Sequence, residues 1–410
     1  MTSARLAWQA LMHQRSRTLI SVVGTAFSVV LMFMQLGFLG AVDQTASLLY
    51  DKLQFDLILV ADDYSDLSKP GSVDRTQLSR AAGVPGVVAV QPFSIGNAAW
   101  QNPDSVKDDP TRGMFRWQLS VVGVDPGRFD SIFQPPGARG LFATAEEQSQ
   151  KRARLSQLDT VLLDERSRPD FGDIEQMREG DTTSLNGQRV TFGGTFRAGT
   201  GFSYTGLLLT NEQTFQKYLR TSPRRCTCGL IQLEPGASTD AVKAGLQQLF
   251  EISHDKKQTP TAQRVQVFTR AELIRLERDY WVSGTSLGVF FTFGSVLAIS
   301  VGMIFIYQMM VADIKKNLPE YATLKAMGYP FGFLFRVVVC QGLFLALGGF
   351  LLGAAAALPT YTLTAGLARL PMTMTAERLL LVSALTVGMC VVSAMLAVQK
   401  VRTADPADLF

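Results

Sequence analysis

LISVVGTAFSVVLMFMQLGFLGAV, from Leu19 to Val42, is a long and almost entirely apolar segment. It lies in a run of 25 residues, Thr18 to Val42, that contains no Asp, Glu, Lys or Arg. A helix needs about 20 predominantly apolar residues to cross the ~30 Å hydrocarbon core of a bilayer. The run far exceeds the roughly 7–15 residues of a signal-peptide core, and it lacks an obvious small-x-small cleavage site. We therefore expect a retained membrane anchor.

Three more charge-free runs follow, 33, 32 and 21 residues long, at Tyr280–Ala312, Val337–Ala368 and Leu379–Gln399. Buried helices of a soluble protein would normally show a charged residue within about twenty positions, so the four runs predict four transmembrane helices. The composition agrees, because only 18% of the 410 residues are charged, against roughly 25% in soluble domains. The formal net charge of +4 is too small for a nucleic-acid-binding protein.

The segments between these runs are very unequal, and about 237 residues separate the first two spans. This insert holds 28 of the 39 basic and 30 of the 35 acidic residues, which predicts a water-facing domain. The short segments next to the four spans carry nine basic residues on the side of the membrane where both termini lie, and two on the opposite side. This bias predicts cytoplasmic termini and a large outer domain.

The predicted layout is an interfacial segment at 1–17, transmembrane helix 1 at 18–42, the outer domain with its stalk ends at 43–279, transmembrane helix 2 at 280–312, a cytoplasmic loop with a short helix at 313–336, transmembrane helix 3 and its outer extension at 337–368, transmembrane helix 4 at 379–399 and a cytoplasmic tail at 400–410.

Within the insert, short apolar runs alternate with helical patterns, which predicts an α+β domain. Asn186-Gly187 indicates a two-residue β-hairpin turn, and the polar stretch from Gln101 to Arg116 indicates a loop. Helices are expected at Asp74–Ala82 and Thr239–Phe250. The expected strands are Phe55–Val60, Val87–Phe93, Leu119–Val124, Thr160–Asp164, Gly206–Thr210 and Leu230–Glu234.

The exit from the outer domain carries the T-x-x-E spacing of a helix capping box at Thr269 and Glu272. No proline follows before Pro319. One helix, passing through Leu276 and Tyr280, is therefore expected to run from Arg270 to about Ala312, roughly 65 Å. The first span is likewise expected to continue toward Leu53, which would give two stiff stalks. The alternative is a break at the membrane surface, where Gly284 and Gly288 are candidate hinges.

Several kinds of chemistry are disfavoured. None of the twelve lysines follows a glycine, so the chain lacks the G-K-[ST] phosphate cradle and is not expected to be the ATPase or another enzyme. The two histidines, His13 and His254, make a Ser-His-Asp site improbable. Cys226 and Cys228 with His254 lack a fourth zinc ligand. A reactive disulfide remains an alternative for the two cysteines, but incidental thiols are the favoured interpretation, and no metal site is expected.

The spans contain no central charged residue, which disfavours a proton relay or an ion pathway. Gly349 and Gly353 have the small-xxx-small spacing that lets helices approach closely, and we regard them as a candidate dimer face. Such a pair also arises by chance in a glycine-rich span. Between the second and third spans, Asn317, Pro319 and Gly328 bound a helix of about nine residues that is too short to cross the membrane.

Four motifs carry a family resemblance. LPEYATLKAMGY (Leu318–Tyr329) resembles the cytoplasmic helix of permeases of the FtsX/MacB/LolC superfamily of ABC transporters. MFMQLGF (Met32–Phe38), LDERSRPDFG (Leu163–Gly172) and RTADPADLF (Arg402–Phe410) resemble the DevC-type branch of that superfamily. The resemblance covers essentially the full length. It implies an inner-membrane homodimer with four spans per chain and a periplasmic domain between helices 1 and 2.

The resemblance also implies a function. A separate cytoplasmic ATPase, which binds ATP and Mg, would dock on the short helix and drive a movement that the stalks transmit outward, a process called mechanotransmission. A periplasmic membrane-fusion adaptor and a TolC-like outer-membrane channel would complete an exporter of envelope lipid or glycolipid. An FtsX-like transducer that activates a cell-wall hydrolase, or LolC-like lipoprotein release, are the alternatives. The coupling residues implied are Leu318, Pro319, Glu320, Tyr321, Thr323, Leu324, Lys325, Met327 and Gly328.

Overall fold

The computed structural model of the chain describes residues 3–13, 15–103, 116–252, 264–316, 331–368 and 370–402. The chain divides into two compact units. The membrane unit combines Met1–Ala41 with Ser286–Phe410, and the other unit, Val42–Thr285, is the outer domain. The large domain is thus inserted between the first and second membrane helices, as the sequence predicts.

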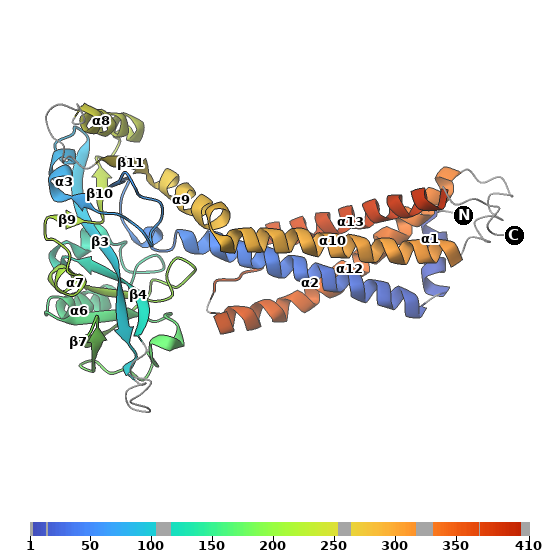
Figure 1. The fold of residues 1–410 in the computed structure, drawn as a ribbon, viewed down its shortest axis with the longest axis horizontal. Coiled ribbons are helices and arrows are strands. Elements are labelled where there is room, and N and C mark those ends of the chain that lie inside the picture. Colours follow the sequence, from blue (N-terminus) through green and yellow to red (C-terminus); the bar gives the residue numbers. More distant parts are fainter. Residues whose placement is uncertain are drawn as a thin grey trace. The chain divides into compact units, whose positions relative to one another are not determined.

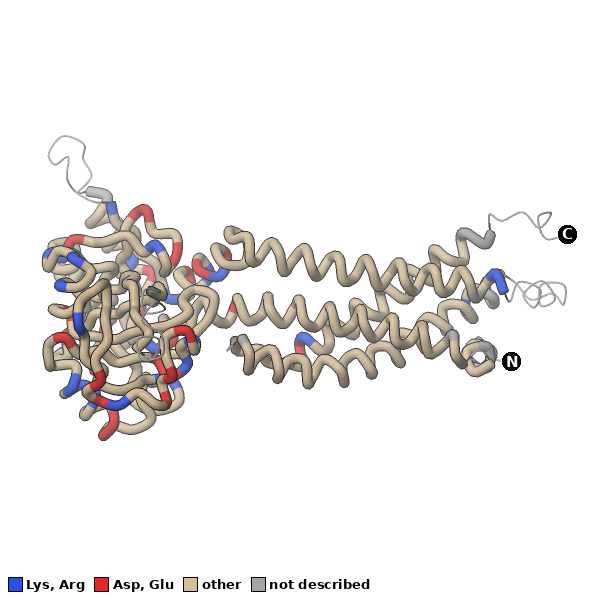
Figure 2. Tube along the Cα trace, turned by 60° about the horizontal axis from the view of Figure 1, so that its bottom comes forward, with Lys and Arg blue, Asp and Glu red and all other residues tan. Residues whose placement is uncertain are grey.

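Long helices make up the membrane unit (Figure 1). Four of them are long and apolar enough to cross a bilayer, over Thr18–Ala46, Ser286–Lys316, Phe335–Leu367 and Ala376–Gln399. Charged residues are rare along these helices and are spread over the outer domain (Figure 2). The prediction of four membrane helices is confirmed. The helices of this unit are α1 (Ser3–His13), α2 (Arg15–Ala46), α10 (Ser286–Lys316), α12 (Phe331–Ala368) and α13 (Ala376–Arg402).

Glycines let α2 and α12 pack closely. A Cβ atom built on Gly349 would lie 2.5 Å from Thr25 Cβ, and one on Gly353 would lie 2.7 Å from Val29 Cβ. The side of α12 that carries both glycines therefore faces α2 of the same chain. This corrects the predicted dimer face, because the small-xxx-small spacing admits any neighbouring helix and here α2 occupies the position.

The outer domain is built on a nine-stranded sheet in the order β11-β1-β10-β3-β4-β8-β5-β7-β6. The long strand β3 (Val87–Gln101) belongs to both halves, because its first part pairs with β10 and its second with β4. Its end also pairs with β6, at Trp100 and Leu185, so six strands close into a ring. The other strands are β1 (Leu57–Ala61), β4 (Arg116–Val124), β5 (Thr160–Asp164), β6 (Thr182–Leu185), β7 (Gln188–Phe196), β8 (Leu207–Asn211), β10 (Cys228–Leu233) and β11 (Val265–Thr269), with β2 (Val73–Asp74) and β9 (Arg225–Cys226) in a separate pair.

Three buried apolar clusters hold the described part of this domain together. Strand β1 contributes to two of them, because Leu57 and Leu59 pack toward α3 and α8 while Ile58 and Val60 pack on the opposite face. A strand that is apolar at every position is expected when both faces are covered. The helices are α3 (Arg75–Ala81), α5 (Phe129–Ile132), α6 (Ala145–Leu155), α7 (Glu212–Leu219), α8 (Thr239–Ile252) and α9 (Arg270–Asp279), with the short turns η1 (Tyr50–Lys52), η3 (Pro126–Arg128), η4 (Pro169–Phe171) and η5 (Tyr280–Gly284).

The local predictions for this domain agree with the structure. All six expected strands form, and the Asn186-Gly187 hairpin joins β6 to β7 with positive φ angles of 50° and 81°. Asp74 caps α3 by accepting a hydrogen bond from the Thr76 backbone N–H. Most of the predicted loop from Gln101 to Arg116 lies outside the described residues.

The predicted continuous exit helix is wrong. Helix α9 ends at Asp279, a π-helical turn follows from Tyr280 to Gly284, and Thr285 is extended with φ −106° and ψ 153°. Glycine costs about 1 kcal/mol in a helix interior and β-branched Thr also disfavours it, so this position is a natural break. Gly284, one of the two candidate hinges, lies at the break. The entry helix α2 has no such break between Arg15 and Ala46, although it ends short of Leu53.

The contact between Gly353 and α2 predicts a matched pair of substitutions. Gly353→Leu places a side chain against Val29 and the Ala26 backbone and is expected to destabilise the membrane unit by about 1–3 kcal/mol. A Cβ atom built on Gly366, in the same helix, meets no atom within 4 Å, so Gly366→Leu should not destabilise the unit. Thermal unfolding in detergent compares the two variants, and equal midpoints would contradict the packing described.

Candidate functional site

The entry and exit of the outer domain are joined by a set of contacts that we call the stalk junction. The Arg270 guanidinium, at the start of α9, donates to the backbone oxygens of Tyr50 and Leu53 at 2.8 and 3.1 Å and pairs with Asp51 at 3.2 Å. It also lies 5.2 Å from the centre of the Phe55 ring. One side chain of the exit thus holds the turn that follows α2.

A buried carboxyl lies at the centre of the stalk junction. Glu277 of α9 is fully buried, and the Tyr50 hydroxyl donates to its Oε1 at 2.9 Å. The Tyr64 hydroxyl donates to the same oxygen. Burial raises the pKa of Glu277 from 4.5 to about 7, because the charged form is desolvated. The entry turn and the exit helix therefore share a buried polar contact whose charge changes near neutral pH.

Two further contacts complete the stalk junction. Arg278 forms an ion pair with Asp43, which lies in the last turn of α2. At the other end of α9 the predicted capping box is present, since the Thr269 side chain accepts from the Glu272 N–H and Glu272 accepts from the Thr269 N–H. Lys243 binds Glu272 at 2.5 Å, and this hydrogen bond is the main cause of the lowered pKa of Glu272. The predicted stalk residues Leu276 and Tyr280 are half-buried.

The LDERS segment, which the sequence analysis used only as a family motif, contains a buried aspartate that holds two loops together. Asp164 at the end of β5 is fully buried and accepts the backbone N–H groups of Ala198 and Gly199 at 3.0 Å each. Burial raises its pKa to about 6. The hydroxyl of Thr200 donates to the backbone oxygen of Arg166 at 3.0 Å. Asp164 thereby fixes the loop after β7 against the turn after β5.

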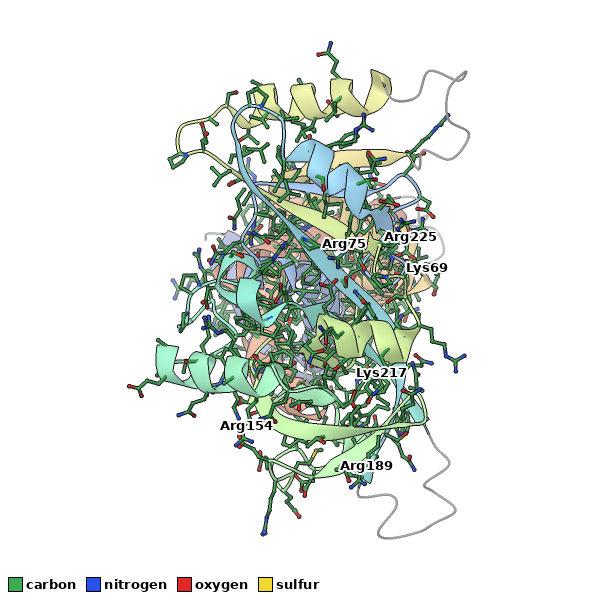
Figure 3. The ribbon with its side chains drawn as sticks, turned by 90° about the vertical axis from the view of Figure 1, so that its left-hand side faces the viewer. Lys69, Arg75, Arg154, Arg189, Lys217 and Arg225 are labelled. Carbon is green, nitrogen blue, oxygen red and sulfur yellow. The ribbon has the colours of Figure 1, made fainter. Side chains whose placement is uncertain are left out.

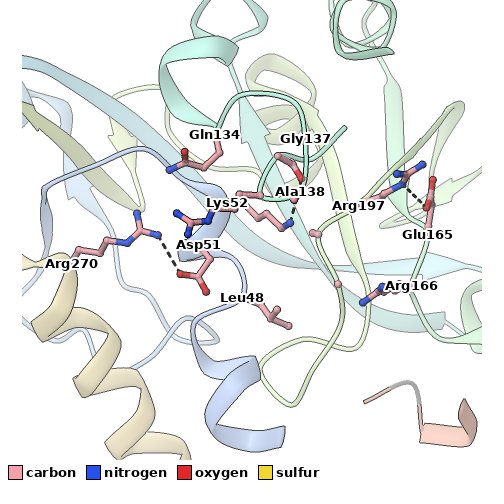
Figure 4. A pocket seen from close by; sticks show the side chains of 14 residues that line it. Leu48, Asp51, Lys52, Gln134, Gly137, Ala138, Glu165, Arg166, Arg197 and Arg270 are labelled. Atoms are coloured by element: carbon pink, nitrogen blue, oxygen red, sulfur yellow. Dashed lines mark hydrogen bonds and ion pairs between the residues drawn. The ribbon is translucent and has the colours of Figure 1, made fainter. Parts of the chain in front are cut away.

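The turn after β5 and the loop after β7 line a cavity of about 1090 Å³ that we call the basic pocket (Figure 4). Its other walls are the turn after α2 and the loop from Gln134 to Gly140. Arg197 pairs with Glu165 at 3.2 Å, and Lys52 donates to the Gly140 backbone oxygen at 3.3 Å. The cationic residues that line the basic pocket are Lys52, Arg139, Arg166, Arg197 and Arg270, and the acidic ones are Asp51 and Glu165.

Some of the basic residues labelled on the domain face in Figure 3 form ion pairs. On that face Arg75 pairs with Glu212, Arg154 with Glu179, and Lys217 with Asp159. Within the ranges that the structure describes, neither Arg139 nor Arg166 of the basic pocket has a carboxylate within ion-pair distance. Five cations and two carboxylates thus leave the lining of the pocket with an excess of positive charge.

Several predicted functional residues can now be located. The coupling residues from Leu318 to Gly328, and His254, lie outside the described residues. Cys226 and Cys228 are free, buried thiols on β9 and β10, and burial raises the pKa of Cys226 to about 11. The two thiols form no disulfide in the structure, which agrees with the incidental thiols that the sequence favoured.

Sequence reasoning missed the residues that meet across the domain. Tyr50 and Tyr64 give no signal of their own, because their partner Glu277 lies more than 200 residues later in the chain. Glu277 is one of several charged residues on a polar helix. The LDERSRPDFG motif was the only available clue to the basic pocket, since it supplies two of the pocket residues and Asp164 beneath them.

Residues 292–406 match the model of the FtsX-like permease C-terminal region. Residues 18–249, more than half of the chain, match the MacB-like periplasmic core domain. The chain belongs to the FtsX/MacB/LolC superfamily of ABC transporter permeases. Members of this family are permeases that work with an ABC ATPase carried on a separate subunit, and this one is a membrane protein with a periplasmic domain.

Three solved structures resemble the periplasmic domain of this permease. They are the extracellular domain of the noncanonic ABC-type transporter YknZ from Gram-positive bacteria (13% identity, 53% of this chain and 100% of that one, TM-score 0.34), the periplasmic region of MacB from Actinobacillus actinomycetemcomitans (10%, 55% and 94%, 0.35) and a domain of a putative permease from Porphyromonas gingivalis (16%, 54% and 91%, 0.32). The permease matches no curated protein sequence.

The buried carboxyl of Glu277 predicts a pH dependence of stability. A carboxyl with a raised pKa in the folded state binds more protons there, so its contribution is full below pH 4.5 and is lost as pH rises through about 7. The change amounts to about 3 kcal/mol over this window. Glu277→Gln keeps a neutral hydrogen-bonding group and should remove most of this loss.

The measurement is thermal unfolding of the permease in detergent at pH 5.5 and pH 8. Asp66 also raises the pKa of Glu277, so Asp66→Asn is a useful second variant and should shift the transition to lower pH. Asp164 adds a dependence of the same sign at lower pH, which the Glu277→Gln variant retains. An unchanged difference between the two pH values in Glu277→Gln would contradict the assignment.

Proposed function

We propose that this permease transmits the movement of a separate ATPase to a periplasmic assembly and acts in a MacB-like tripartite exporter. The observation that carries the proposal is the stalk junction. Asp43, Tyr50 and Asp51 on the entry side each contact the exit helix α9, so a displacement of α2 is passed to the outer domain at three points. The spans also lack the central charges that a substrate pathway through the bilayer usually needs.

The two connections have different mechanical roles in this proposal. Helix α2 is unbroken across the boundary between the units, and a helix of 32 residues is a stiff element about 48 Å long. The exit is jointed at Thr285, where the chain is extended between η5 and α10. Movement therefore enters the outer domain through α2, while the joint lets α10 change its angle without unwinding α9.

The remaining parts of the proposal follow from the family resemblance. The permease works as a homodimer in the inner membrane, with cytoplasmic termini and the helix from Leu318 to Gly328 as the docking element for the ATPase. ATP and Mg bind on that partner. A membrane-fusion adaptor and a TolC-like channel receive the substrate, an envelope lipid or glycolipid, on the periplasmic side. The excess of basic residues on the flanks near the termini supports this orientation.

The docking element is tested by substitutions at Leu324. Leu324→Asp places a charge where an apolar contact with the ATPase is expected, and burying an unpaired carboxylate is costly. We expect the ATPase to be lost from the purified complex while the permease remains folded. Leu324→Met conserves the volume and should retain the ATPase. Co-purification at equal expression compares them, and full retention by Leu324→Asp would falsify the assignment of this helix.

The stalk junction is tested by exchanging the charges of Asp43 and Arg278. Arg278→Glu or Asp43→Arg alone places like charges together, whereas the double variant restores an ion pair of opposite orientation. The side chains are half-exposed, so the fold should survive in all three proteins. Spin labels on the outer domains of the assembled complex report their separation with and without ATP and vanadate.

We expect each single variant to hydrolyse ATP with a smaller change in that separation than the unmodified permease, because one of the three contacts is lost, and the double variant to recover the change. ATP-dependent movement of normal size in both single variants would exclude transmission through this contact. The readout needs no knowledge of the exported substrate, which makes it the direct test of the proposal.

A further inference from the structure

The basic pocket carries an inference beyond the transmission of movement. We propose that it binds the phosphate-bearing headgroup of an anionic membrane lipid, and that this lipid class is the substrate. The inference rests on the proposed export function and specifies its substrate class.

The charge of the basic pocket favours an anion. Five cationic side chains and two carboxylates line it, an excess of three positive charges in one cavity. The carboxyl of Asp164 beneath the wall removes at most one of them when it is ionised. Four of the five cations are arginines, whose planar guanidinium groups match the geometry of phosphate. Burial lowers the pKa of Lys52, and a bound anion would relieve that cost.

The position of the pocket favours a lipid over a soluble anion. The first membrane span covers 29 residues, Thr18 to Ala46. At ~1.5 Å per residue this is about 43 Å, the thickness of a bilayer with its headgroup regions. Leu48, which lines the pocket, follows only two residues later, so chain connectivity keeps it within about 7 Å of the end of the span. Leu48 therefore lies close to the lipid headgroups.

Hydrogen bonds fix the backbone of the pocket wall. Asp164 fixes the backbone at Ala198 and Gly199, and Gly199 has φ +98°, a conformation that favours glycine. Thr200 holds the backbone of Arg166. The volume of about 1090 Å³ is enough for a lipid headgroup, and a concave site fits a headgroup better than it fits the surface of an acidic protein. A headgroup therefore meets a preformed concave site.

The test uses the full-length permease in a neutral detergent. Native mass spectrometry measures the binding of phosphatidylglycerol and of phosphatidylcholine with the same acyl chains. The pocket variant is Arg166→Gln with Arg197→Gln. The control, Arg189→Gln with Arg220→Gln, removes the same charge from exposed positions of the same domain that do not line the pocket, and Arg189 lies on the face drawn in Figure 3. Thermal unfolding verifies that both variants are folded.

We expect the pocket variant to bind phosphatidylglycerol at least tenfold more weakly and to lose its preference over phosphatidylcholine, while the control matches the unmodified permease. Equal binding by the pocket and control variants would overturn the site. Displacement of the lipid by millimolar inorganic phosphate would assign the pocket to a soluble anion and overturn the lipid. The assay involves neither ATPase nor export, so its outcome is independent of the Leu324 and Asp43–Arg278 experiments.

Discussion

The antiparallel pairing of β1 with β11 determines where the chain enters and leaves the periplasmic domain. The register places Leu57 opposite Thr269, so the segment before β1 and the helix after β11 must lie side by side. Every contact of the stalk junction depends on this pairing. Arg270 reaches the entry turn because it directly follows β11, and Glu277 meets Tyr50 two helical turns later.

The two connections to the membrane are not equivalent, although the sequence suggests a matched pair. Helix α2 continues through the boundary of the units, whereas the exit passes through a π-helical turn and the extended Thr285. In the proposed mechanism the unbroken α2 carries the movement and the break at Thr285 accommodates it, while the ion pairs and the buried carboxyl hold the entry turn against α9.

The sequence predicts the features that depend on short-range patterns. Charge-free runs identify the spans because the hydrocarbon core excludes charge over a fixed length, and the Asn186-Gly187 turn identifies its hairpin through local backbone preference. Contacts between residues that are far apart in the chain cannot be predicted from such patterns. The spacing of Gly349 and Gly353 indicates a close contact without naming α2, and nothing near Arg166 or Arg197 shows that five cations meet in one cavity. Gly284 indicates a possible break next to Thr285, but the absence of proline before Pro319 favoured the prediction of a continuous helix.

The central place of β1 in the sheet has a consequence for biogenesis. Its neighbours, β10 and β11, lie about 170 and 210 residues later in the chain, so β1 has no strand partner until almost the whole domain has been synthesised and translocated. Pairings of such long sequence separation form slowly. The first span is already anchored during this interval, which keeps an apolar, aggregation-prone strand at the membrane surface and leaves it dependent on the timely arrival of its last partner.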